Sequence, residues 1–158
     1  MDAFLDIETT GLSPYMNHVT VVGLCLGDSG EVVQLVGESI SSRRLLEALA
    51  QAKTIYTYNG ARFDLPFLRC QLGIDLGQQF GHRDLMQDCW RRNLYGGLKA
   101  VERRLGIPRR LKEVDGREAV RLWERYQKRR DHEALRLLLD YNKEDVLNLR
   151  SLKERLRV

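Results

Sequence analysis

Long apolar stretches are missing from this 158-residue chain. A helix that spans a bilayer needs about 18 or more consecutive apolar residues, and no segment reaches that length. Acidic residues at positions 2, 6 and 8 interrupt the N-terminal region, so it does not have the pattern of a secretory signal peptide. We expect no membrane partner and a cytoplasmic location.

Cysteine and histidine are also scarce, with three of each. Cys25, Cys70 and Cys89 are widely spaced and set among apolar residues, which predicts reduced thiols that are buried or partly buried in a cytosolic protein. No set of cysteines and histidines has the spacing of a zinc site. The histidines, at positions 18, 82 and 132, are isolated from one another, so a histidine general base is unsupported.

The sequence has no internal repeat, low-complexity tract or linker, and its length is sufficient for one domain with a sizeable core, residues 1–158. A Gly-Asp-Ser-Gly turn at 27–30 lies between two apolar strands and predicts a β-hairpin. Helices and strands alternate after the hairpin, so we expect an α/β fold with a mixed sheet flanked by helices. The expected strands are 3–8, 19–26, 31–36, 53–58 and a short one near 82–86, and the expected helices are 42–52, 64–73, 97–105, 116–130 and 131–155.

The strand at 3–8 is the first place where carboxylates stand against the local pattern. Alternation along a strand puts Asp6 and Glu8 on one face and Leu5 and Ile7 on the other. Adjacent carboxylates repel each other and lose hydration when they are buried, and a divalent cation removes both costs. The alternative is an edge strand whose acidic face lies in water.

Asp64 is the second candidate. The strand at 53–58 ends at Asn59-Gly60, and Asp64 precedes a helical pattern that has Pro66 in its first turn. This position predicts that Asp64 is the N-cap of the helix. A cap needs only one carboxylate oxygen, so capping alone and capping combined with metal binding both stay open. Further along, the stretch 82–84 favours a surface turn over an extra carboxylate near the site.

The third candidate lies on the final helix. At about 100° per residue, Asn142 and Asp145 fall inside its apolar leucine stripe, and Tyr141 falls on the edge of that stripe. Tyr141 and Asp145 are four residues apart and share a face. Because a carboxylate on a buried stripe needs a partner, we favour a metal ion there. The alternative is an ion pair with an arginine.

Together these regions resemble, in order and spacing, the three motifs of the DEDD superfamily of 3′–5′ exonucleases. The stretches that carry the resemblance are Asp6-Ile7-Glu8-Thr9-Thr10-Gly11, Tyr58-Asn59-Gly60-x-x-Phe63-Asp64 and Tyr141-x-x-x-Asp145. The second is similar to the form in family B DNA polymerase proofreading domains, and the third to the tyrosine subclass, DEDDy. The stretch 98–107 also resembles a group of stand-alone predicted exonucleases. The resemblance implies a ribonuclease H-like fold.

The resemblance also implies a role for each matching position. One cation would be held by Asp6, Glu8 and Asp145. Asp6 would bridge to a second cation, whose water shell Asp64 would hold. Tyr141 would orient or deprotonate the attacking water.

Four further positions would contact the terminal nucleotide by the same resemblance: Thr9, Leu12, Asn59 and Phe63. Each also has an ordinary alternative, as a strand end, a packing residue, a turn or a core residue. For the chemistry itself, phosphodiester hydrolysis needs an activated water, charge neutralisation at phosphorus and a stabilised leaving oxygen. Two Mg²⁺ or Mn²⁺ ions about 4 Å apart supply all three, and such hard ions prefer oxygen ligands.

Charge is distributed unevenly along the chain. Residues 1–90 carry 6 basic and 11 acidic side chains, whereas residues 91–130 carry 14 basic and 5 acidic ones. The basic segment includes Arg109, Arg110 and Lys112, which we expect in a loop that tracks a nucleic-acid backbone. The alternative is a solvated helix face.

We therefore expect a metal-dependent 3′–5′ exonuclease that acts on single-stranded DNA or RNA 3′ ends. A nucleic-acid-binding module with a silent site and a structure-specific endonuclease of the same fold are the alternatives. No motif reads a 2′-hydroxyl, so the sequence does not separate DNA from RNA. Nor does it identify a protein partner.

Overall fold

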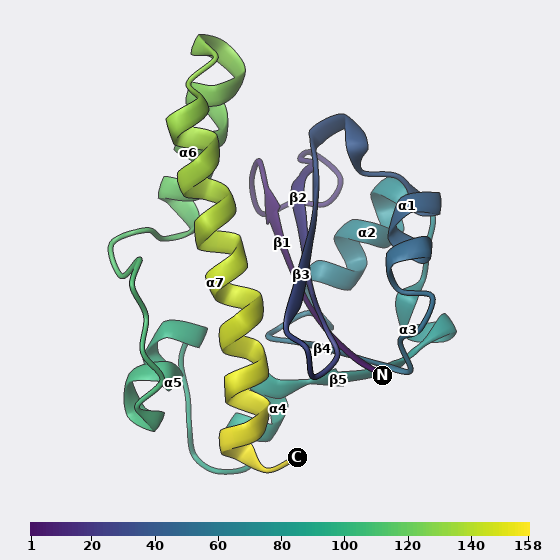
Figure 1. Ribbon diagram of the computed structural model, residues 1–158, viewed down its shortest axis with the longest axis vertical. Coiled ribbons are helices and arrows are strands. Elements are labelled where there is room, and N and C mark those ends of the chain that lie inside the picture. Colours follow the sequence, from purple (N-terminus) through teal and green to yellow (C-terminus); the bar gives the residue numbers. More distant parts are fainter.

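A five-stranded mixed sheet forms the centre of the molecule, in a computed structural model that describes residues 1–158 (Figure 1). The strand order is β3-β2-β1-β4-β5. The pairs β1–β2 and β2–β3 are antiparallel, and the pairs β1–β4 and β4–β5 are parallel. The strands are β1 (Asp2–Thr9), β2 (Val19–Leu26), β3 (Glu31–Val36), β4 (Thr54–Thr57) and β5 (Gly81–Asp84).

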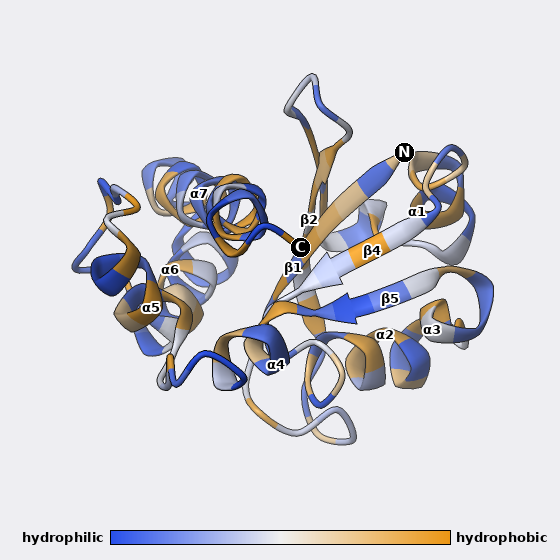
Figure 2. Cartoon of the chain, turned by 90° about the horizontal axis from the view of Figure 1, so that it is seen from below, coloured by the Kyte–Doolittle hydropathy of each residue, from blue (hydrophilic) through white to orange (hydrophobic).

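Helices cover both faces of this sheet. On one side lie α1 (Ser42–Ala48), α2 (Asp64–Leu72) and α3 (Leu76–Gln79), and on the other side lie α5 (Leu98–Leu105), α6 (Gly116–Arg129) and α7 (His132–Leu156) (Figures 1 and 2). A short α4 (Leu85–Trp90) follows β5, and a 3-10 turn, η1 (Gly37–Ser39), follows β3. The expected α/β fold with a mixed sheet flanked by helices is confirmed.

Side-chain alternation along β1 assigns each face of the sheet to its own core. Leu5 and Ile7 pack with apolar residues of α1 and α2, as the alternation predicts. Phe4, on the opposite face, packs with β4, α4 and α7. The face of β1 that carries Asp6 and Glu8 is therefore the face that α7 covers.

Several local predictions were wrong. The helix expected at 42–52 ends at Ala48, and the strand expected near 82–86 ends at Asp84, where α4 begins. Neither α3 nor α4 was expected. Cys25 and Cys89 are buried, but Cys70 is exposed, since it points outward from the last part of α2. No helix is both long enough and apolar enough to cross a membrane.

Candidate metal centre and cleft

Folding brings three carboxylates together between β1 and α7. Asp6, Glu8 and Asp145 each offer one oxygen, and these oxygens all lie within 4.8 Å of one another. Two of the residues come from the same face of one strand, and the third comes from the buried stripe of a helix at the other end of the chain. The edge-strand alternative for Asp6 and Glu8 is wrong, because β1 has a neighbour on each side.

Close contact between α7 and the sheet depends on Asn142, which is fully buried. Its Nδ2 donates to the backbone oxygen of Asp6 at 3.1 Å and to the Asp6 carboxylate at 3.2 Å. Its Oδ1 accepts from Gln34 Nε2 at 3.0 Å. Gly23 pairs with Asp6 across β1–β2, and a Cβ at this position would lie 2.0 Å from Asn142 Oδ1. Gly23 thus leaves the space that sets the distance between Asp145 and β1.

Asp64 lies beside this group but is not the N-cap that the sequence predicted. The cap position is Phe63, and Asp64 is the first residue of α2. Its Oδ2 accepts from the backbone N–H of Ile7 at 3.0 Å. The pairing of β1 with β4 ends at Phe4, so the Ile7 N–H has no strand partner on that side and the carboxylate takes its place.

Asp84 fixes the turn that leads into α2. Its carboxylate accepts from the backbone N–H groups of Asn59 at 2.8 Å and Ala61 at 3.2 Å, and it also caps α4. Asn59 has a left-handed backbone with φ of 61°, which an asparagine tolerates better than most residues. The surface turn predicted at 82–84 is therefore wrong, because Asp84 is a buried strand residue that orders the second motif.

Crowding of carboxylates has a clear electrostatic effect. Burial, followed by repulsion from neighbouring carboxylates, raises the pKa of Asp6 and of Glu8 well above the usual range. Burial also raises the pKa of Asp64 to about 7 and that of Asp145 to about 6, although hydrogen bonds to Ile7 and Arg109 respectively act in the opposite direction. Full ionisation of this group at neutral pH therefore requires additional positive charge.

The residues fit a hard divalent cation. Glu8 Oε1 is buried and has no hydrogen-bond partner, which is costly unless something else binds it. The atoms that could bind a metal here are all carboxylate oxygens, the ligands that Mg²⁺ and Mn²⁺ prefer.

Tyr141 lies one turn before Asp145 on α7 and lines the same cleft. Its ring lies 5.4 Å from Lys99 Nζ and 5.9 Å from the Arg109 guanidinium carbon. Burial, with repulsion from Asp145 and Glu8, raises the pKa of Tyr141 well above its usual value. The phenol therefore stays protonated at neutral pH.

Arg109 lies in the loop between α5 and α6, as the sequence predicted, but its side chain is only 7% exposed, so it cannot track a nucleic-acid backbone. Its Nη2 donates to Asp145 Oδ1 at 2.6 Å, so Asp145 has the arginine partner that was the alternative to a metal. Arg110 and Lys112 are exposed as expected. Sequence patterns provided no signal for this contact, because a loop arginine carries no periodicity to mark it as buried.

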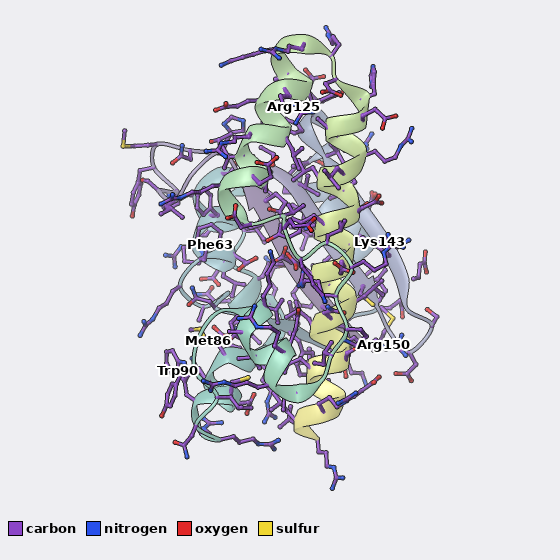
Figure 3. The ribbon with its side chains drawn as sticks, turned by 90° about the vertical axis from the view of Figure 1, so that its left-hand side faces the viewer. Phe63, Met86, Trp90, Arg125, Lys143 and Arg150 are labelled. Atoms are coloured by element: carbon purple, nitrogen blue, oxygen red, sulfur yellow. The ribbon has the colours of Figure 1, made fainter.

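A cleft of about 890 Å³ opens beside the carboxylates. Thr9, Leu12 and Phe63 line it, whereas Asn59 is not among its lining residues. Leu12 is 86% exposed, so it does not pack as its structural alternative required. Phe63 lies at the level of the middle of α7, on the side away from Lys143 (Figure 3).

The first half of α6 forms part of the cleft wall, which the sequence analysis did not single out. Arg117 and Arg121 line the cleft from this helix. They are four residues apart and so lie on one face of it. That spacing, at the start of a helix in the basic segment, is a signal that could have identified them.

Comparison with known proteins places this geometry in a family. A family model described as the RNase_H superfamily matches residues 3–157. The uncharacterized protein YprB of Bacillus subtilis (strain 168) is 30% identical over an alignment that covers 94% of this chain and 40% of YprB. The chain thus spans well under half the length of this relative.

Solved structures agree with the fold. NrnC of Brucella melitensis with bound Mg²⁺ has a TM-score of 0.70 at 22% identity, over 99% of this chain and 71% of NrnC. NrnC bound to pGG has a TM-score of 0.68 at 20% identity, over 99% of this chain and 71% of NrnC. A nuclease in its apo form has a TM-score of 0.62 at 22% identity, over 98% of this chain and 70% of that nuclease.

The family B DNA polymerase from the hyperthermophilic archaeon Pyrobaculum calidifontis has a TM-score of 0.68 at 17% identity, over 99% of this chain and 24% of the polymerase. At such sequence identities, the likeness to these four structures supports the fold alone. The family match covers nearly the whole chain, and the sheet order and helical layers agree with it. The chain belongs to the RNase_H superfamily.

Proposed function

We propose that residues 1–158 form one metal-dependent 3′–5′ exonuclease domain of the tyrosine subclass, DEDDy. The observation that carries the proposal is the convergence of Asp6, Glu8 and Asp145 within 4.8 Å, with Tyr141 beside them in an open cleft. The first and third motifs supply these residues, and the second supplies Asp64, in the order and spacing of that subclass.

In this proposal Asp6, Glu8 and Asp145 hold one Mg²⁺ or Mn²⁺ ion, and Asp6 with Asp64 serves a second. Such ions supply an activated water and neutralise charge at the phosphorus. Asp64 is fixed to β1, the strand that carries Asp6, through the Ile7 N–H. The Mg²⁺ bound by NrnC, which has the same fold, supports the choice of ion.

Tyr141 orients the attacking water in this proposal. Without a bound cation, the raised pKa keeps the phenol protonated at neutral pH, so the hydroxyl is available as a hydrogen-bond donor. Of the two roles that the motif resemblance implied, orientation is therefore favoured over deprotonation.

The substrate we propose is a single-stranded DNA or RNA 3′ end. Thr9, Leu12 and Phe63 offer a largely apolar wall for the terminal base, and Arg117 and Arg121 offer positive charge for its phosphates. Asn59 is proposed to act on the same nucleotide from the second motif. The pGG that NrnC binds is a small ligand consistent with a site for strand ends.

Degradation of end-labelled oligonucleotides tests the proposal. With Mg²⁺ or Mn²⁺ present, a single strand labelled at its 5′ end should shorten one nucleotide at a time, and a 3′ label should be released at once as a mononucleotide. Metal chelation should stop both. Matched DNA and RNA strands in the same assay would identify the preferred sugar.

Two other functions predict different products. A binding module with a silent site would retain the strands without shortening them, whatever the metal. A structure-specific endonuclease would cut a circular single strand, which has no end from which an exonuclease can start. Either result contradicts the proposal.

A further inference from the structure

A chain of buried ion pairs leads away from Asp145. Arg109 donates from Nε to Glu102 Oε2 at 2.7 Å and from Nη2 to Glu102 Oε1 at 2.6 Å, a two-point fork. The same Nη2 reaches Asp145 Oδ1 at 2.6 Å. Glu102, on α5, is 1% exposed. Buried charges of this kind are costly and are weak evidence for stability, so their presence calls for another explanation.

The segment that carries Arg109 is fastened to α7 on both sides of the arginine. Asn148 Nδ2 donates to the backbone oxygen of Pro108 at 3.3 Å. The Glu144 carboxylate accepts from the backbone N–H groups of Arg110 at 2.8 Å and Leu111 at 2.9 Å. The chain between α5 and α6 runs along the side of α7, as Figure 1 shows. Arg109 is therefore held in place by its backbone as well as by Glu102.

We propose that Arg109 is a positioning residue that fixes the Asp145 carboxylate for cation binding, and that Glu102 fixes Arg109. The inference rests on the proposed cation site. Arg109 engages only Oδ1, which leaves Oδ2 of Asp145 without a hydrogen-bond donor in the protein. An outer-shell partner of this kind sets the orientation of a ligand before the metal arrives.

Glu102 also solves a charge problem. An arginine beside a cation site would by itself repel the cation. Glu102 is paired to the same guanidinium, and Glu144 Oε1 lies 3.8 Å from Nη1, so Arg109 adds no net positive charge to the site. The fork also fixes the plane of the guanidinium, which a lysine cannot reproduce.

Calorimetric titration with Mn²⁺, without nucleic acid, tests this inference. Arg109→Lys retains the charge but loses the fork, and Glu102→Gln retains the shape but weakens the fork. Each should weaken Mn²⁺ binding roughly 10- to 100-fold. Arg110→Lys is the matched control, since the Arg110 side chain is exposed and only its backbone contacts Glu144, and it should bind Mn²⁺ as the wild type does.

Melting temperatures without metal distinguish positioning from a purely structural role. If Arg109→Lys or Glu102→Gln melts at a lower temperature but retains the wild-type Mn²⁺ affinity, the proposal is overturned. The ion pairs then only stabilise the fold. Tighter Mn²⁺ binding in either variant overturns it as well, because Arg109 then competes with the cation. If Arg109→Lys does not fold, Glu102→Gln decides alone.

The titration is also independent of nuclease activity. A wild-type protein that binds Mn²⁺ but does not degrade strands contradicts the proposed function and leaves this inference standing. A wild-type protein that does not bind Mn²⁺ overturns both.

Discussion

Tyr141 is the residue whose chemistry is easiest to isolate, because phenylalanine retains its ring packing and removes one oxygen. The ring lies between α7 and the cations of Lys99 and Arg109, and these contacts do not need the hydroxyl. If the hydroxyl orients the attacking water, Tyr141→Phe should lower turnover roughly 10²-fold, the scale of one general acid–base contribution. Substrate affinity should change little. Single-turnover kinetics would measure this, and an unchanged rate would make Tyr141 a packing residue.

Asp6 provides the matching test of the metal site. Asp6→Asn removes one charge from a crowded group, so without metal the variant should melt at the same or a higher temperature than the wild type. It should also lose the stabilisation that Mg²⁺ gives the native state by mass action, together with nearly all activity. Asp28→Asn, in the exposed β2–β3 turn, is the control. Melting curves with and without Mg²⁺ would check this, and a variant with wild-type activity would exclude Asp6 as a ligand.

At the scale of single residues, the sequence patterns located the carboxylates but not the residues that hold the site in place. Alternation on β1 and the stripe on α7 placed Asp6 and Asp145 because each pattern fixes a face of one element. Arg109 and Asp84 act between elements, and nothing in their neighbouring residues records which partner they meet. The same reason explains the error on Asp64, because its partner, the Ile7 N–H, becomes free only where β4 stops pairing with β1.

Among the elements, α6 carries the arginines that we propose for the role predicted for Arg109 in the loop before it. Arg117 and Arg121 line the cleft, whereas Arg109 is buried and so cannot follow a strand along the surface. Replacing both cleft arginines with glutamine should weaken single-strand binding and flatten its salt dependence. The slope of log affinity against log salt should fall by roughly 0.7 for each phosphate that the protein no longer neutralises.

The matched control lies on the same helix. Lys128 and Arg129 are exposed in the last turn of α6 and do not line the cleft, so their replacement with glutamine removes the same charge from another place. This control should leave the salt slope unchanged. Equal effects of the two double variants would mean that only the net charge of the protein attracts the strand.

Element boundaries show where sequence patterns lose information. The helices α6 and α7 span 14 and 25 residues, enough turns for a repeating apolar stripe, and both were predicted within two residues of their ends. The helices α3 and α4 span 4 and 6 residues, too few for such a repeat. The helix α3 contacts β5, and α4 packs against β4 and α7, contacts that the sequence does not reveal.

Across the whole molecule, the proposed ligands come from the first ten residues, from α2 and from the last long helix. The site therefore exists only when the sheet and α7 are assembled, and any cation bound there is linked to global folding. The order of elements predicted a mixed sheet flanked by helices, whereas the meeting of these residues at one site was an implication of the motif resemblance. The α5–α6 connection was not predictable in the same way.

The same carboxylates should control how stability depends on pH. Asp64 and Asp145 have native pKa values of about 7 and about 6 against an ordinary value of 3.8, and the pKa values of Asp6 and Glu8 are also raised. The native state thus retains protons that the unfolded chain has lost. Their contribution to stability is fully present below the ordinary carboxyl pKa and is lost as pH rises through the native values. His82, whose pKa burial lowers, acts in the opposite direction and offsets part of this loss.

The metal-free protein should therefore melt at a lower temperature at about pH 8 than at about pH 5. Saturating Mg²⁺ should reduce or reverse this fall, because the cation binds the deprotonated carboxylates and competes with their protons. Asp64→Asn has one carboxyl group with a raised pKa fewer, so without metal its melting temperature should fall less between these two pH values. Melting curves in chelator and in Mg²⁺ across this range provide the measurement. A metal-free melting temperature that rises toward pH 8 would mean that the carboxylates are already neutralised within the protein, Arg109 being the first candidate for that role.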